Sequence, residues 1–568
     1  NLVTVGAAGT ASSVAGIPLY SLSNSIYTHD VSGTDDTASS NTAYGIVAMD
    51  AITTGDNNSA VGYGALGANT TGGQNIAVGR LALRANTTGD NNVSLGEGSL
   101  YANTTADNNV AVGRNAMAAN TTGTRNMAIG TSAYTASDTE NDNMAIGYNA
   151  MVTNTAGGTQ NLAVGNYALD ALTSGDQNTA IGFEAQTATT TGSNNTSVGT
   201  ESMITNTTGA QNTALGVYSL YTSNGSDNTA VGYSAMEANT TGTNNTSVGK
   251  DALKGNTTAA ENTAVGMSAL KTNSTGQDNV ALGYSALELN TTGDRNVALG
   301  YKALEANTTA DYNIAVGFES LYTNTTGARN MAIGKSAYGA SDTENDNIAI
   351  GYEAMATNTA GGTQNIALGN YALDALTSGD NNIAIGYAAG GAITTGGSNT
   401  LIGRYAGITA TTVSGNTAVG DNALRVNVAE YNTAVGAFAL DSNTTGTTNT
   451  AVGYGALDAN STAEYNTGIG AYALVAATTG SYNTALGRSA GLAITTGTRN
   501  VAVGVDTLKA VTTGVNNVAV GANALASATA GETVAIGYAA LNAMTAAVKN
   551  TAVGHEALTA NTTGYNNT

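Results

Sequence analysis

Hydrophobic and polar positions recur along this chain with a period of 17 residues. The unit is NSAVGYGALGANTTGGQ at 58–74, and it starts again at 75 as NIAVGRLALRANTTGDN. Its motif, Asn-x-(Ala/Ser)-(Val/Ile/Leu)-Gly-x-x-(Ala/Ser)-(Leu/Met), can be followed in 31 copies from Asn41 to Leu558, with a few spacings of 16 or 18 residues. A fixed short period is typical of a solenoid, in which each unit stacks on the next.

We number each unit from its Asn as position 1 and call one unit a coil. Positions 2 to 4 are a short run such as Ile-Ala-Val, position 5 is Gly in every copy, positions 8 and 9 are usually Ala-Leu, and positions 12 to 15 are usually Asn-Thr-Thr-Gly. Two short apolar runs separated by Gly and a polar turn predict two strands per coil. A helix is disfavoured because apolar spacing of 3.6 is absent and Gly is frequent. The pattern predicts an all-β parallel β-solenoid (β-roll) of 31 coils.

Two positions are expected to form structural ladders along the solenoid. The Gly at position 5 indicates a corner with positive φ, close approach of a neighbouring backbone, or both. The Asn at position 1, replaced only by Thr533, is expected to hydrogen-bond from coil to coil, as stacked Asn side chains do in cross-β structures. The ladder residues singled out are Asn58, Gly62, Asn75, Gly79, Asn245, Gly249, Asn449 and Gly453.

The chain divides into an irregular start and a continuous array. Residues 1–40 hold one degenerate repeat and the single Pro, and we interpret them as an N-terminal cap or linker. Residues 41–568 form the repeat array. Within it, 126–182 and 330–386 are nearly identical at an offset of 204 residues, twelve periods of 17. Such duplication of whole coils requires that coils be interchangeable along the axis.

The first strand of each coil has two different faces. Small residues occupy positions 1, 3 and 5, whereas Thr, Val, Ile or Met occupy positions 2 and 4. One face therefore suits the coil interior, and the other suits a partner chain, which predicts a bundle of identical chains. The array stops just inside a new unit, so end-to-end stacking of copies is a further option.

Composition narrows the possible chemistry. The net charge of −22 argues against nucleic acid or an anionic membrane as a direct partner. The chain has two His, His29 and His555, and no Cys. Catalytic triads and metal sites built from His or thiolate ligands need more such residues, so we expect no enzyme, no cofactor and no metal. No apolar stretch is long enough to span a membrane. The acidic stretch SDTENDN, at 137 and again at 341, lacks the GGxGxD pattern of calcium-binding β-rolls.

Two sets of residues offer possible contacts with sugars. Tyr is the abundant aromatic residue, and at position 6 it could stack on glycan rings or pack across neighbouring coils. Examples are Tyr148, Tyr233, Tyr284 and Tyr301. The Asn of the Asn-Thr-Thr turn is also a formal N-glycosylation acceptor. Examples are Asn69, Asn86, Asn120 and Asn290.

The motif resembles a known family. NTAVGYSAM at 228–236 and NIAIGYEAM at 347–355 are similar to the YadA-like head repeats of trimeric autotransporter adhesins, and the 17-residue unit is similar to repeat arrays of phage tail-fibre proteins. The resemblance covers 41–568 and implies a left-handed β-roll with three chains around one axis. The unit is longer than the usual adhesin head repeat because the Asn-Thr-Thr-Gly turn is added.

These observations lead to a functional hypothesis. We expect a structural or adhesive fibre shaft, extracellular at a cell surface or on a virion tail fibre, that is homotrimeric and contacts a host-surface glycan or matrix. One alternative is a filament that polymerises end to end. Another is an ice- or glycan-binding solenoid that uses Thr, Asn or Tyr ladders.

Overall fold

The protein is a parallel β-solenoid of about 30 turns, with 32 parallel strands and about 17 residues per coil. The structure is a computed structural model that describes residues 12–14, 17–22, 25–28, 37–529, 531–546 and 548–568. No helix occurs among these residues. The prediction of an all-β parallel solenoid with one coil per repeat is confirmed.

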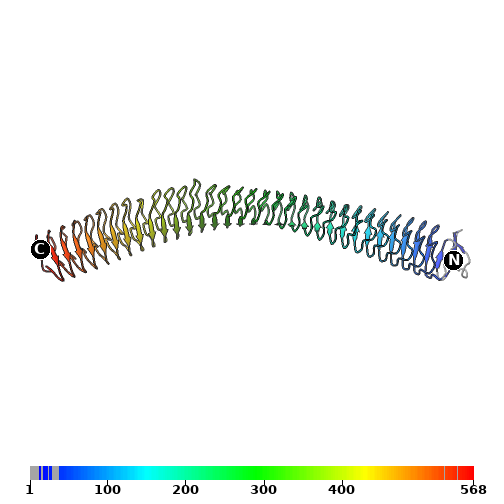
Figure 1. The fold of residues 1–568 in the computed structure, drawn as a ribbon, viewed down its shortest axis with the longest axis horizontal. Helices are drawn as coiled ribbons and strands as arrows, with labels where there is room; N and C mark the ends of the chain where they lie inside the picture. Colours follow the sequence, from blue (N-terminus) through cyan, green and yellow to red (C-terminus); the bar gives the residue numbers. More distant parts are fainter. Residues whose placement is uncertain (1–11, 15–16, 23–24, 29–36, 530, 547) are drawn as a thin grey trace. The chain divides into compact units, whose positions relative to one another are not determined.

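The chain forms two compact units, Asn1–Ala281 and Leu282–Thr568. Figure 1 shows one short strand arrow in each coil of each unit. The repeat strands of the first unit are β4 (Thr42–Tyr44), β5 (Ser59–Val61), β6 (Ile76–Val78), β7 (Val93–Leu95), β8 (Val110–Val112), β9 (Met127–Ile129), β10 (Met144–Ile146), β11 (Leu162–Val164), β12 (Thr179–Ile181), β13 (Thr196–Val198), β14 (Thr213–Leu215), β15 (Thr229–Val231), β16 (Thr246–Val248) and β17 (Thr263–Val265).

The second unit repeats the same element. Its strands are β19 (Val297–Leu299), β20 (Ile314–Val316), β21 (Met331–Ile333), β22 (Ile348–Ile350), β23 (Ile366–Leu368), β24 (Ile383–Ile385), β25 (Thr400–Ile402), β26 (Thr417–Val419), β27 (Thr433–Val435), β28 (Thr450–Val452), β29 (Thr467–Ile469), β30 (Thr484–Leu486), β31 (Val501–Val503), β32 (Val518–Val520), β33 (Val534–Ile536) and β34 (Thr551–Val553). Strand β18 (Val280–Leu282) contains the boundary between the units.

Each strand occupies positions 2 to 4 of its coil and pairs in parallel with the same positions of the next coil. In β5 and β6, for example, Ala60 is opposite Ala77. Because side chains alternate along a strand, position 3 points inward and positions 2 and 4 point outward. Ala77 is fully buried, whereas Ile76 is 43 % exposed and Val78 is 37 % exposed. The predicted division between an inner face of small residues and an outer face of β-branched residues is therefore present.

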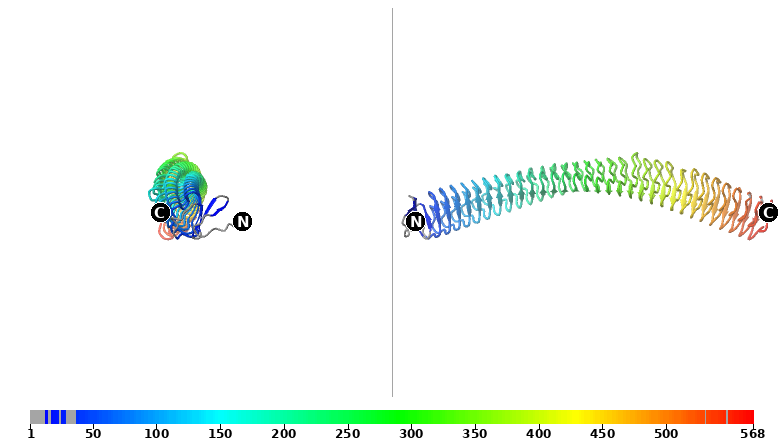
Figure 2. Two further views of the ribbon diagram at one scale, coloured as in Figure 1. Left: turned by 90° about the vertical axis from the view of Figure 1, so that its right-hand side faces the viewer. Right: turned by 180° about the vertical axis from the view of Figure 1, so that it is seen from behind.

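The second predicted strand, at positions 8 and 9, is wrong. Those positions lie in a turn, because positions 7 and 9 take left-handed backbone conformations, with φ of 59° at Leu81 and 51° at Leu83. The turn directs Ala82 and Leu83 into the core, where both are fully buried. Its backbone still bonds from coil to coil, since the Leu83 N–H donates to the Ser99 carbonyl at 2.9 Å. Figure 2 shows the coils from behind, with loops joining successive strand arrows.

The core is a narrow column of Ala at positions 3 and 8 and Leu or Met at position 9. Where position 9 is Gly, a neighbouring side chain fills the space. A Cβ on Gly390 would lie 3.1 Å from Ile393, which replaces the usual Asn at position 12, and 2.9 Å from Leu401 of the next coil. A larger side chain at position 12 or position 3 therefore fills the volume that Gly leaves empty at position 9, as close packing requires.

The described strands that precede the repeat array pair antiparallel with one another. β1 (Ser12–Val14) pairs antiparallel with β2 (Ile17–Leu22), which pairs antiparallel with β3 (Ser25–Tyr27). β3 then pairs in parallel with β4, the first repeat strand. Much of the predicted cap at 1–40, including His29, lies outside the described residues.

Candidate functional surfaces and internal ladders

The Asn at position 1 is buried and hydrogen-bonds from coil to coil. The Asn58 N–H donates to Asn41 Oδ1 at 2.8 Å, and Asn58 Nδ2 donates to the Gly72 carbonyl at 2.9 Å. In the next coil the Asn75 N–H donates to Asn58 Oδ1 at 3.0 Å. Asn245 and Asn449 make the same pair of contacts.

The Gly at position 5 meets both conditions that exclude a side chain. Its φ is 136° at Gly62 and 140° at Gly79, within the region that L residues rarely adopt. A Cβ on either residue would lie 2.4 Å from the carbonyl oxygen of the equivalent Gly in the next coil. Gly249 and Gly453 share these features, with φ of 137° and 133°. The backbone at this corner therefore has a positive φ and also packs closely against the same corner of the next coil.

A second Asn ladder, which was not predicted from the sequence, runs along position 12. Asn86 Nδ2 donates to Asn69 Oδ1 at 2.8 Å, and Asn120 Nδ2 donates to Asn103 Oδ1 at 2.9 Å. The recurrence of Asn in the turn was the signal that could have revealed the ladder. Asn69, Asn86, Asn120 and Asn290 are all fully buried. A glycan on any of these amides would have no room in the folded coil, so the N-glycosylation hypothesis does not fit the structure.

Threonines occur in two different environments. In the turn, the hydroxyl of Thr70 donates to the Thr87 carbonyl at 3.0 Å, so it binds the next coil rather than solvent. A second column points outward from position 2 of consecutive strands and is in register from β12 to β17. Its members are Thr179, Thr196, Thr213, Thr229, Thr246 and Thr263.

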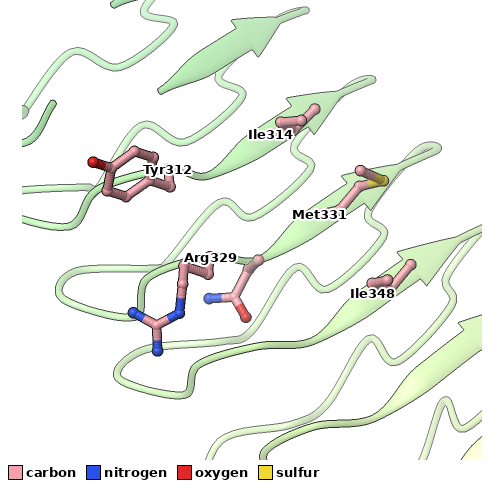
Figure 3. Close-up of a pocket in the computed structure, with 6 residues that line it drawn as sticks. Tyr312, Ile314, Arg329, Met331 and Ile348 are labelled. Carbon is pink, nitrogen blue, oxygen red and sulfur yellow. The ribbon is translucent and has the colours of Figure 1, made fainter. Parts of the chain in front are cut away.

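The outward side chains at positions 2 and 4 form a surface that we call the strand face, which carries Val, Ile, Leu and Met together with the Thr of position 2. Figure 3 shows part of it in the second unit, where Ile314, Met331 and Ile348 follow one another on β20, β21 and β22. Tyr312 and Arg329 lie beside this row and help to line a shallow apolar pocket. The strand face recurs on every repeat strand because it belongs to the repeat itself.

The position-6 tyrosines contact aromatic rings of adjacent coils. Tyr284 and Tyr301 stack with centroids 5.3 Å apart and an interplanar angle of 11°. Tyr148 and Tyr233 instead make edge-to-face contacts, with Tyr167 and with a neighbouring tyrosine respectively. All four position-6 rings remain between 42 % and 48 % exposed. Of the two interpretations of these tyrosines, this geometry supports packing across neighbouring coils.

Opposite charges also pair between equivalent positions of adjacent coils. Arg80 pairs with Glu97 at 2.8 Å, and Arg125 pairs with Asp142 at 2.6 Å. The hydrogen bond from Arg125 lowers the pKa of Asp142. These side chains are solvated, so each pair adds little to stability, but together they favour correct stacking of coils.

In the acidic stretch at 137–143, the buried carboxylate receives its hydrogen bonds from the protein itself. Glu140 is buried, and its carboxylate accepts hydrogen bonds from the N–H groups of Asp138 (2.9 Å), Thr139 (3.0 Å) and Gly157 (3.1 Å). Within the described part of the chain, no group of three or more His, Cys, Asp or Glu side chains is placed to hold a metal ion. His555 is exposed and stacks on Tyr538, with the ring centroids 5.1 Å apart.

The chain has no match among known families. No protein-family model matches it, and no curated protein matches it in sequence. Among the described residues, none of the elements is a helix of the length and apolarity that crossing a membrane would require.

Proposed function

We propose that this protein is a structural fibre shaft in which the strand faces of three identical chains pack together. The observation that carries the proposal is the strand face itself. It exposes Val, Ile, Leu and Met side chains on successive coils, including Ile76 and Val78. Soluble monomers rarely expose contiguous apolar patches larger than a few hundred Å², so a surface of this kind favours association.

A second copy of the same chain is the partner that best fits the strand face. Side chains on this face repeat at the spacing of adjacent parallel strands, about 4.8 Å. An identical chain placed parallel and in register presents the same spacing along its whole length. Rotational symmetry then closes the assembly without leaving an open apolar face. The resemblance to YadA-like head repeats favours three chains and a left-handed β-roll.

The proposed role is to hold binding elements at a distance from the surface that carries them. Coils linked by buried Asn ladders and backbone bonds make a stiff support, because each coil is fixed by its neighbours. The same resemblance favours an extracellular or virion-borne location and contact with a host-surface glycan or matrix.

The solution mass and a pair of matched variants test this proposal. We expect light scattering to give three chains per particle. Val231→Lys combined with Val248→Lys places two charges on the strand face and should yield monomers. Met267→Lys is the control, because position 6 lies past the Gly corner and already holds Lys in the preceding coil, at Lys250. A monomeric parent chain would overturn the proposal, and long filaments would favour end-to-end polymerisation.

The outward Thr column supports ice binding as a second candidate. Thr179 to Thr263 place hydroxyl and methyl groups at regular spacing on a strand surface. Thr213→Lys combined with Thr229→Lys should abolish any inhibition of ice growth. A shaft whose strand faces are covered by partner chains should show no such inhibition, which separates the two candidates.

A further inference from the structure

A recess in the second unit is lined mainly by tyrosine rings and small residues. It crosses three consecutive coils that start at Asn365, Asn382 and Asn399, on the wall formed by positions 6, 7, 10 and 11 rather than on the strand face. Its lining residues include Tyr371, Asp374, Tyr387, Ala388, Gly391 and Tyr405. Neither the internal ladders nor the strand face accounts for this cluster.

The rings form three sides of a box. Tyr371 and Tyr387 have centroids 5.8 Å apart and planes at 79°, and Tyr387 and Tyr405 have centroids 5.4 Å apart and planes at 86°. Tyr371 and Tyr405 both occupy position 7, in coils two apart and therefore about 9.6 Å apart along the axis. The coil between them has Ala388 at position 7. A large side chain is therefore missing from this row, between two aromatic rings.

A carboxylate without a basic partner lies at the edge of the box. Asp374 is partly buried, and no described residue forms an ion pair with it. Its Oδ1 lies 3.4 Å from where a Cβ on Gly391 would stand, so the carboxylate borders the glycine in the floor of the recess. Burial raises the pKa of Asp374. Arg404, which lies over the Tyr405 ring at 5.4 Å from its centroid, is already paired with Asp421 at 2.8 Å.

We propose that this recess binds a quaternary ammonium group. Aromatic faces attract such cations through their quadrupoles, and boxes of several rings are a recurrent way to bind trimethylammonium groups. The small side chains of the floor leave space for the methyl groups, and the Asp374 carboxylate supplies the opposite charge. The net charge of −22 favours a cationic ligand over an anionic one.

The duplicated block offers an internal comparison. At the offset of 204 residues, Tyr167, Asp170 and Phe183 correspond to Tyr371, Asp374 and Tyr387. Glu184 stands where Ala388 leaves the gap, however, and Glu201 stands where Tyr405 closes the box. The first copy therefore keeps two of the rings and the carboxylate but lacks both the gap and the third ring. We expect binding at the second copy alone.

Titration of the full chain with choline and tetramethylammonium, followed by calorimetry, tests the proposal. We expect saturable binding of both, and at least tenfold weaker binding of 3,3-dimethylbutanol, the neutral isostere of choline. Ala388→Leu should weaken choline binding at least tenfold by filling the gap, and its fold should persist because Leu81 occupies position 7 naturally. Tyr405→Ala should weaken binding by removing one wall. Ser336→Leu, the same kind of change at position 7 of a coil that does not line the recess, should leave binding unchanged.

The proposal would be overturned by no binding of either cation, by equal binding of the neutral isostere, or by full affinity in both Ala388→Leu and Tyr405→Ala. Tighter binding of a neutral methyl glycoside than of choline would also overturn it, because that result would assign the rings to sugar stacking. Co-sedimentation with phosphatidylcholine vesicles identifies a surface headgroup as the source of the ligand, and choline binding without co-sedimentation identifies a free compound.

Discussion

The carboxylate of Glu140 accepts a hydrogen bond from the backbone N–H of Gly157 in the next coil, at 3.1 Å. Gly157 lies in the turn of the 18-residue coil that starts at Asn143, and its φ of 104° suits glycine. Glu344 and Gly361 repeat the contact at 3.0 Å in the second copy of the block. An acidic residue at position 15 and a longer turn in the following coil therefore occur as one structural unit.

We predict that Glu140→Gln loosens the turn at 154–158. The amide nitrogen of Gln cannot accept from the N–H groups that face the carboxylate, so at least one buried donor is left unsatisfied, at a cost of about 1–3 kcal/mol. Hydrogen exchange followed by mass spectrometry should show faster exchange in peptides that contain Gly157. Glu344→Gln is the control and should affect only the second copy. Unchanged exchange in both variants would mean that the carboxylates do not hold these turns.

A second prediction concerns the glycine corner. Gly62→Ala must place a Cβ 2.4 Å from the Gly79 carbonyl oxygen at a φ of 136°, so the contact between two coils has to open. We expect a local destabilisation of at least about 3 kcal/mol, detected as rapid proteolysis within these coils. Gly67→Ala is the matched control, because its φ lies outside the left-handed region and its Cβ would come no closer than 3.2 Å to the Arg84 guanidinium and the Gly64 carbonyl oxygen. Equal resistance of both variants to protease would contradict this account of the corner.

The sequence predicted those features that follow from the repeat alone. Gly in every copy at position 5 indicated a corner, and small residues at positions 1 and 3 indicated the inner face. It did not predict the turn at positions 8 and 9. Ala82 and Leu83 look like part of a strand in the sequence. Left-handed conformations are costly for Leu, so its backbone preference argues against the φ of 51° observed at Leu83. Stacking of identical turns, a tertiary effect, overrides that local preference.

Surface sites were harder to predict than the coil. The box around Ala388 depends on a residue that is small while its neighbours two coils apart are aromatic, Tyr371 and Tyr405. Such a gap becomes visible only once the coil fixes which positions lie side by side. The burial of Asn69 was equally hidden, because an Asn-Thr-Thr turn usually suggests an exposed loop.

A third prediction uses two buried tyrosines. The Tyr134 hydroxyl accepts hydrogen bonds from Asn143 Nδ2 at 2.6 Å and Asn154 Nδ2 at 3.2 Å, and burial raises the pKa of Tyr134 above its usual range. Tyr338 has the same setting, with the pKa raised for the same reason. The folded coil favours the neutral phenol, so its contribution to stability is complete below the unfolded pKa of about 10 and declines as pH rises further.

An alkaline titration checks this third prediction. Phenolate absorbance should show a late component that appears only as the coils open, and Tyr134→Phe combined with Tyr338→Phe should remove it. Tyr63→Phe serves as the control for the loss of a tyrosine as such, since Tyr63 is 53 % exposed. If the late component persists in the double variant, it must arise from other tyrosines.

The last prediction tests the Asn ladder and uses Thr533, the one position-1 residue that is not Asn, as a natural comparison. Asn245 Nδ2 donates to the Ala259 carbonyl at 2.8 Å, and Asn245 Oδ1 accepts from the Asn262 N–H at 3.0 Å. Asn245→Asp keeps the acceptor but turns the donor into an oxygen that faces a carbonyl inside the core. Thr533, the natural exception, keeps its own N–H bond to Asn517 Oδ1 at 3.2 Å without the amide donor. We therefore expect Asn245→Thr to be milder than Asn245→Asp.

The two variants should also differ in their response to pH. A carboxylate buried beside a carbonyl has its pKa raised, and the protonated acid regains a donor for the Ala259 carbonyl. Stability of Asn245→Asp should then recover partly as pH falls from 7 towards 4, whereas that of Asn245→Thr should not follow pH in this way. Hydrogen exchange in peptides covering 245–262, corrected for the intrinsic effect of pH, measures both. A pH response shared by the two variants would show that the amide donor is not what holds these coils together.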